Sequence, residues 1–167
     1  AVTGRIFTAD HHVYDLPPLL SWNVRHTGTV PCDSWSVTAV YQPEMLTVLR
    51  MAAGFAAIEN GMTQLRGIVD EYTVELGSRG MTVTLSGRGY AARLLDNESR
   101  PVTYEQVTLR ELIRCHAEPY GISCGAAVDL RSTVPYTAGV GISQWKVISE
   151  FCRTYGGFLP RFAKTGE

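Results

Sequence analysis

Apolar and polar residues alternate along the first half of the chain with the period of β-strands. Residues 19–27 carry apolar or aromatic side chains at every second position, and residues 34–41 repeat this alternation. Such a pattern is typical of a strand with one face in a core and the other in solvent. Gly28 and Pro31 supply turn geometry between the two segments, so the sequence predicts a β-hairpin.

Two further hairpins and a short helix follow. Asn60-Gly61 separates two apolar segments and is the strongest short hairpin signal in the chain. A turn bounded by glycines at residues 77–80 joins two more alternating segments, and a helix is expected over residues 43–50. Successive hairpins without crossover helices predict an antiparallel β-barrel or sandwich over residues 1–96.

The period changes to that of helices after Pro101. Thr108 and Glu111 form a T-x-x-E capping box at the start of an apolar stripe that ends before Pro119. The pattern therefore predicts an amphipathic helix between these positions.

A second helix begins at Ser143, a typical N-cap residue, and ends at Gly156-Gly157, after which a strand is predicted over residues 158–162. Residues 97–167 are therefore expected to form a small α+β domain with two helices. The fold class is α+β, mainly an antiparallel β-barrel followed by this small domain.

Composition and charge exclude some classes of function. The formal net charge of the 167 residues is −1, and arginines are scattered among carboxylates, so no basic face favours sequence recognition of nucleic acids. No apolar run is long enough for a membrane span, and the chain is expected to be soluble and cytoplasmic when made. Because numbering opens at Ala1 without a Met and residues 157–167 resemble a strand running into a turn, we interpret the chain as a fragment of a longer polypeptide.

A nucleotide-binding alternative comes from Gly87, Gly89 and Ala92, which fit the G-x-G-x-x-G/A spacing of a dinucleotide-binding turn. The context does not fit, because residues 91–95 are too short for a crossover helix and the acidic candidate Glu111 lies inside a predicted helix. We therefore expect no cofactor.

The cysteines suit buried, reduced thiols better than a disulfide framework, because Cys32, Cys115, Cys124 and Cys152 are widely spaced and contain no C-x-x-C pair. Cys115, His116 and Cys124 lack a fourth ligand with ordinary zinc spacing. We therefore expect no metal site.

Candidate catalytic groups also have simpler explanations. Asp10, His11, His12 and Asp15 are close in sequence but lie near a terminus, where solvated loops are common. Ser143 lacks the second glycine of a nucleophile elbow.

Two other pairs fail on geometry. Cys115 and His116 would point about 100° apart on a helix, so they do not form a nucleophile and base. Asp70 and Glu71 would face opposite sides of a strand. The sequence predicts no catalytic residue and no enzyme.

A third class of function is a β-rich module that binds carbohydrate or peptide on a platform of Trp22, Trp35 and Tyr41. In the predicted register Trp22 and Trp35 lie on apolar strand faces, where aromatic side chains usually fill a core. An exposed platform would need a contiguous apolar surface patch.

The order of several motifs resembles a known family. Ser86-Gly87-Arg88 precedes an Ala-to-Asp segment at residues 92–96, and Pro119-Tyr120-Gly121-Ile122 and the helix-plus-strand segment 143–162 follow. In this order they resemble the phage tail baseplate hub family, the late-control D and Mu-like tail proteins also found in prophages. The resemblance covers most of residues 65–163, whereas residues 1–64 match only in their hairpins.

This resemblance implies a structural protein of the virion tail that is assembled in the bacterial cytoplasm. Such hubs resemble duplicated tail-tube barrels, so that a homotrimer joins a sixfold tube to a threefold spike through protein-protein contacts. Asp70, Glu71 and Glu75 would then either pair with a neighbour's arginines or protect a solvated strand edge.

Overall fold

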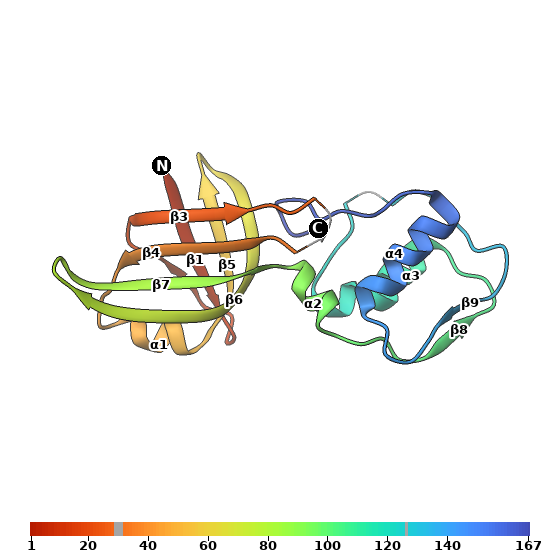
Figure 1. Ribbon diagram of the computed structural model, residues 1–167, viewed down its shortest axis with the longest axis horizontal. Coiled ribbons are helices and arrows are strands. Elements are labelled where there is room, and N and C mark those ends of the chain that lie inside the picture. Colours follow the sequence, from red (N-terminus) through yellow and green to blue (C-terminus); the bar gives the residue numbers. More distant parts are fainter. Residues whose placement is uncertain (29–31, 126) are drawn as a thin grey trace. The chain divides into compact units, whose positions relative to one another are not determined.

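The computed structural model describes residues 1–28, 32–125 and 127–167 (Figure 1). The chain divides into two compact units. The first unit contains residues 1–90 and 164–166, and the second contains residues 91–163 and Glu167. No helix in the described residues has the length and apolar character needed to cross a membrane.

The first unit is a seven-stranded antiparallel sheet with the strand order β2-β1-β5-β6-β7-β4-β3. Its elements are β1 (Val2–Thr8), β2 (Val13–Asp15), β3 (Leu19–Arg25), β4 (Ser34–Val40), α1 (Met45–Arg50), β5 (Ala52–Glu59), β6 (Met62–Gly77) and β7 (Gly80–Gly89). The sheet curls, and Leu19 of β3 comes within 3.4 Å of a Cβ built at Gly4 of β1. Among the described residues, however, no ladder joins the edge strands β2 and β3, so the predicted barrel is a curled sheet without hydrogen-bonded closure.

Two of the three predicted hairpin turns are confirmed. Asn60 and Gly61 have φ values of 51° and 77°, the positive angles that a two-residue type I′ turn requires between β5 and β6. Gly77 pairs with Gly80 across the turn between β6 and β7. β3 pairs with β4 as expected, while the turn predicted at Pro31 lies outside the described residues.

The curled sheet encloses one hydrophobic core. Every second residue of β4 is buried, as its alternation predicts, and the ring of Trp35 stacks on that of Phe55 with centroids 4.0 Å apart. Met45 and Leu49 of α1 join the same core. In Figure 1, β3, β4 and β7 lie in front of β1 and β5, and the core fills the space between them.

Trp22 is an exception to the sequence prediction. It is 47% exposed, although the alternation in β3 placed it on a core face. β3 is an edge strand with a paired neighbour on only one flank, so Leu19 and Val24 are only partly buried against the core and Trp22 stays exposed. The prediction that Trp22 is buried is therefore wrong.

The second unit consists of short helices and a two-stranded antiparallel sheet. Its elements are α2 (Ala91–Leu95), β8 (Val102–Tyr104), α3 (Leu109–His116), a 3₁₀ turn (Glu118–Tyr120), β9 (Tyr136–Ala138), α4 (Gln144–Phe151) and a π-helical turn (Cys152–Gly156). The capping box of Thr108 and Glu111 is present, and the Ser143 hydroxyl accepts a hydrogen bond from the Lys146 amide at 3.1 Å. Both predicted helix starts are confirmed, and so is the α+β class.

Packing in this unit is dense around Phe151 and Tyr136. The two rings meet edge to face with centroids 5.1 Å apart, and the Tyr136 hydroxyl donates to the Val147 carbonyl at 2.7 Å. Burial, with a smaller contribution from Glu150, raises the pKa of Tyr136 to about 12.

The strand predicted over residues 158–162 is wrong. The chain leaves the π-helical turn at Gly157, which has a φ of 69°, and residues 158–162 join no ladder. The Phe162 ring packs on Trp145 instead, with centroids 5.4 Å apart.

Candidate functional site

The Gly87-x-Gly89-x-x-Ala92 segment does not form a dinucleotide-binding turn. Gly87 and Gly89 lie within β7, which pairs antiparallel to both neighbours, where a dinucleotide-binding turn needs a parallel strand. A Cβ at Gly87 would collide with the Ile68 carbonyl oxygen and lie 3.0 Å from its carbon. β6 has a bulge between Val69 and Glu71 that brings its backbone toward Gly87.

The acidic and histidine residues near the start of the chain do not converge on one point. Asp10 lies 3.0 Å from the Nδ1 of His12 and accepts a hydrogen bond from Thr8. Asp15 instead pairs with Arg5 at 2.6 Å, and this contact lowers the pKa of the Asp15 carboxyl. These side chains are largely exposed, which is the geometry of a solvated hairpin surface.

The cysteines differ in burial, contrary to the prediction that all fill core space. Cys152 is buried and its pKa rises to about 11, chiefly through desolvation. Cys115 and Cys124 are exposed, and Cys32 is partly buried. Over the described residues, no group of three or more His, Cys, Asp or Glu side chains is arranged to hold a metal ion.

The proposed aromatic platform is not assembled. Trp35 is 3% exposed and Tyr41 packs against the same core, whereas Trp22 lies on the edge strand. Because two of the three rings are turned inward, the structure leaves a lone exposed tryptophan where the platform would need a row of rings.

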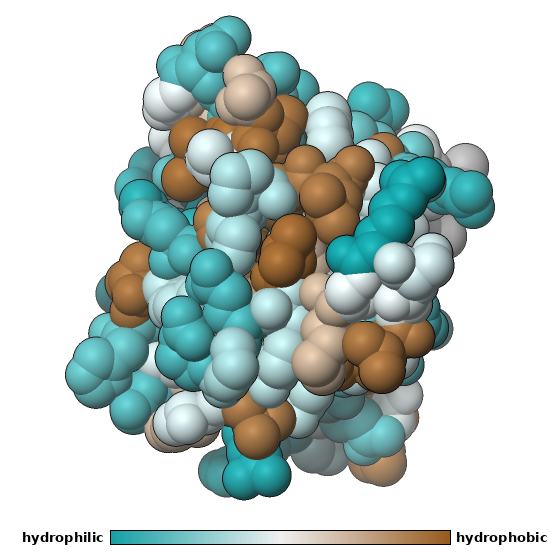
Figure 2. Space-filling model, turned by 90° about the vertical axis from the view of Figure 1, so that its left-hand side faces the viewer, coloured by the Kyte–Doolittle hydropathy of each residue, from teal (hydrophilic) through white to brown (hydrophobic). Residues whose placement is uncertain are grey.

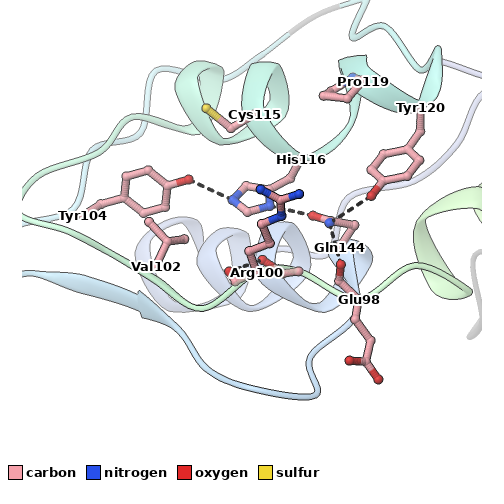
Figure 3. A pocket seen from close by; sticks show the side chains of 10 residues that line it. Glu98, Arg100, Val102, Tyr104, Cys115, His116, Pro119, Tyr120 and Gln144 are labelled. Atoms are coloured by element: carbon pink, nitrogen blue, oxygen red, sulfur yellow. Dashed lines mark hydrogen bonds between the residues drawn. The ribbon is translucent and has the colours of Figure 1, made fainter.

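A pocket of about 450 Å³ lies in the second unit (Figure 3). Its lining comes from the segment before and within β8, from α3 and the 3₁₀ turn, and from the first residue of α4. Figure 3 labels most of the lining residues, namely Glu98, Arg100, Val102, Tyr104, Cys115, His116, Pro119, Tyr120 and Gln144.

A chain of hydrogen bonds forms the floor of this pocket. The Gln144 amide nitrogen donates to the Glu98 carbonyl at 2.9 Å and to the Tyr120 hydroxyl at 3.1 Å. The Gln144 oxygen faces Nδ1 of His116 at 2.6 Å, and Nε2 of His116 faces the Tyr104 hydroxyl at 3.0 Å. The chain links side chains of β8, α3, the 3₁₀ turn and α4 around a buried histidine.

These partners determine the tautomer of the neutral His116 ring. A backbone carbonyl is only an acceptor, so the amide nitrogen of Gln144 must face Glu98 and its oxygen must face His116. Nδ1 therefore carries the proton, and Nε2 accepts from Tyr104. Both ring nitrogens are engaged, so His116 is held in place by its neighbours.

Tyr104 and Cys115 lie beside each other at one end of the pocket. Burial raises the pKa of the Tyr104 phenol, and Cys115 contributes in the same direction through charge and hydrogen bonding. The phenol therefore stays protonated near neutral pH and can donate to His116. Cys115 lies next to the Tyr104 phenol. Both ring nitrogens of His116 already have hydrogen-bond partners, Tyr104 and Gln144.

No local pattern in the sequence indicates this pocket. His116 is buried on α3, and its partners Tyr104 and Gln144 lie 12 and 28 residues away. A histidine on an apolar stripe is the one local signal, because a buried imidazole requires hydrogen-bond partners.

The first unit carries exposed apolar side chains at the ends of three adjacent strands. Leu76 of β6 is 81% exposed, Val40 of β4 is 47% exposed and Met81 of β7 is 43% exposed. Leu76 pairs with Met81, whose carbonyl accepts the Tyr41 amide at 3.0 Å, so the three strand ends are neighbours. Val40 pairs with Thr82 and so faces the other side of the sheet from Leu76 and Met81. We call Leu76 and Met81 the hairpin end, and Figure 2 shows apolar side chains among polar ones on this side of the unit.

Comparisons with known proteins identify the fold. No family model and no curated protein sequence matches the chain. The crystal structure of the tail protein from Neisseria meningitidis MC58 matches with a TM-score of 0.73 and 16% identity, over 99% of this chain and 49% of that one. The chain has the fold of this tail protein.

A second structure with the tail-protein fold is the 43 kDa tail protein of prophage MuSo2 from Shewanella oneidensis. It matches with a TM-score of 0.63 and 14% identity, over 99% of this chain and 53% of that one. The chain thus spans about half the length of both tail proteins. The tail-protein fold includes residues 1–64, where the sequence resembled the family only in its hairpins.

Proposed function

We propose that this chain is part of a phage or prophage tail baseplate hub that joins the tail tube to the spike by protein-protein assembly. The observation that carries the proposal is the match of 99% of the chain to two tail proteins, one of them encoded by a prophage. The proposal gives the chain a structural role, with no cofactor and no catalytic residue.

The hairpin end supports an assembly role. Subunits of a ring contact one another head to tail, so each needs a surface patch that a neighbour covers. Exposed aliphatic side chains such as Leu76 favour burial by about 25 cal/mol for each Å² removed from water. The proposal is that a neighbouring tail subunit covers the hairpin end.

The acidic residues Asp70 and Glu71 of β6 are paired within the sheet. Arg88 binds Asp70 through both nitrogens at 2.9 and 3.0 Å, and Ser86 donates to Glu71 at 3.2 Å. Asp70 and Glu71 therefore have partners on β7, within their own sheet. No pairing with a neighbour is needed to account for them.

The remaining parts of the proposal follow the family resemblance. Residues 1–96 would form the ring-building domain and residues 97–167 a small domain, with the assembled protein a homotrimer in the tail. Because the chain spans about half of each matched protein, these statements concern the full-length protein in its particle.

A complementation experiment tests the proposal. Deleting the gene from the phage or prophage that encodes it should give particles without a complete baseplate, seen by electron microscopy, and the intact full-length protein should restore them. Full-length protein with Leu76→Asp should fail to restore them. Leu159→Asp, a matched change at a 61% exposed leucine of the second unit, should succeed.

Normal particles after the deletion would refute the hub role. If both aspartate variants restored particles equally well, the hairpin end would not be the assembly surface. Thermal unfolding of each variant serves as the control for folding, because both leucines are exposed and neither change removes core packing.

A further inference from the structure

The pocket of the second unit contains two hydrogen-bond donors that its own floor does not use. Arg100 is exposed, and across the described residues its guanidinium takes part in no ion pair. The Tyr120 hydroxyl accepts from Gln144, and no described residue accepts its own proton. A ligand that bound these donors would supply acceptors.

The positions of these groups favour one charge for the ligand. In Figure 3 the Arg100 side chain extends over the His116 and Gln144 floor, and the Tyr120 hydroxyl points toward Gln144. The Glu98 carboxylate points away from the pocket, so it does not neutralise Arg100. The part of the pocket beside the Arg100 guanidinium therefore carries a positive charge.

The remaining lining favours an apolar body behind the charged group. Val102 and Pro119 form hydrocarbon surfaces of the pocket. The volume of about 450 Å³ lies within the range of about 300–1,000 Å³ typical of small-ligand sites. An arginine fork binds a carboxylate through two parallel hydrogen bonds, which a single point charge does not offer.

We propose that this pocket binds a carboxylate attached to a small apolar group, with Arg100 as the ion-pairing residue and Tyr120 as a second donor. Such a group could be the C-terminus of a peptide or a free small acid, and both share this chemistry. The proposal rests on the pocket geometry and does not depend on the hub role. It also assigns a role to the Gln144 hydrogen bonds, because the Gln144 amide donates to the Tyr120 hydroxyl and holds it in position.

Binding can be measured with three probes on the isotope-labelled full chain. N-acetylleucine carries a peptide-like carboxylate, N-acetylleucine amide lacks the charge, and isovalerate has a carboxylate without a peptide group. We expect saturable NMR shifts of the Arg100 side-chain Nε–H and of the Tyr120 amide with the acids, and none with the amide. Tighter binding of N-acetylleucine would identify a peptide C-terminus, and equal binding a free acid.

Variants test the assigned residues. Arg100→Gln should weaken binding of N-acetylleucine by about tenfold or more, because a charge-assisted hydrogen bond is lost. Tyr120→Phe should weaken it by a few fold. Arg110→Gln removes another exposed arginine, on α3 outside the pocket lining, and should leave the affinity unchanged.

Several results would overturn the proposal. These are equal binding of the amide and the acid, absence of saturable shifts with either acid, or an Arg100→Gln variant that binds like the unmodified chain. Amide spectra of each variant show whether the second unit is folded, so a loss of binding can be separated from a loss of structure.

Discussion

Gly87→Ala tests whether the glycine at position 87 is needed for β7 to pair with the bulged strand β6. The added Cβ would meet the Ile68 carbonyl oxygen and lie 3.1 Å from the Asp70 nitrogen, both on the bulged backbone of β6. Backbone cannot rotate away as a side chain can, so β6 and β7 must separate. Overpacking costs about 1–3 kcal/mol, and a lost ladder hydrogen bond about 1 kcal/mol more.

Gly89→Ala is the matched control. A Cβ at Gly89 would lie 3.5 Å from the Asp33 Cβ and 3.6 Å from its nitrogen, which are ordinary contacts. Alanine in a strand gains roughly 0.5–1 kcal/mol over glycine through reduced entropy of the unfolded chain. Gly87→Ala should therefore lose about 2 kcal/mol net, while Gly89→Ala should stay within about 1 kcal/mol of the unmodified chain.

Urea unfolding followed through the amide NMR signals of β4 and β7 measures the first unit separately from the second. Separate measurement matters because two compact units need not unfold in one transition. A lower urea midpoint for Gly87→Ala alone is expected. The packing explanation would be refuted by an unchanged midpoint for Gly87→Ala, or by an equal loss in Gly89→Ala.

Three further predictions concern the second unit. Thr108→Ala should cost about 1 kcal/mol in urea unfolding, and Thr108→Ser should recover most of it because the capping hydroxyl is kept. A thiol reagent should modify the exposed Cys115 and Cys124 well before the buried Cys152, as mass spectrometry of timed samples would show. The pKa of Tyr136 is raised in the folded state, so its contribution to stability is complete below pH 10 and is lost as the pH rises toward 12. Urea midpoints across this range should fall more steeply for the unmodified chain than for Tyr136→Phe, and parallel curves would contradict the assignment.

Features that depend on neighbours in sequence were predictable. The turn at Asn60-Gly61 needs two positive φ angles, which these residue types adopt readily. The Thr108 capping box joins groups three residues apart. In both cases the interactions or backbone angles that define the element lie within a few residues of one another in the sequence.

Features that depend on distant contacts were not predictable. Alternation alone could not show that β3 is an edge strand, which is why Trp22 is exposed. The spacing of Gly87 and Gly89 matches a nucleotide-binding motif, but the close approach of the bulged β6 backbone explains the glycine at position 87. Arg100 and Gln144 meet in the pocket from positions 44 residues apart, so no local pattern marks it.

The ribosome synthesises nearly all of the second unit before the segment that completes the first unit. The Arg66 amide of β6 donates to the Lys164 carbonyl at 3.0 Å, and the Lys164 ammonium donates to Gln64 at 3.0 Å. Residues 91–163 of the second unit are thus synthesised between the sheet and the segment that completes it. A nascent chain stopped after Tyr90 would have every strand of the sheet but would lack these closing contacts, so nearly all of the second unit is synthesised before the first is complete.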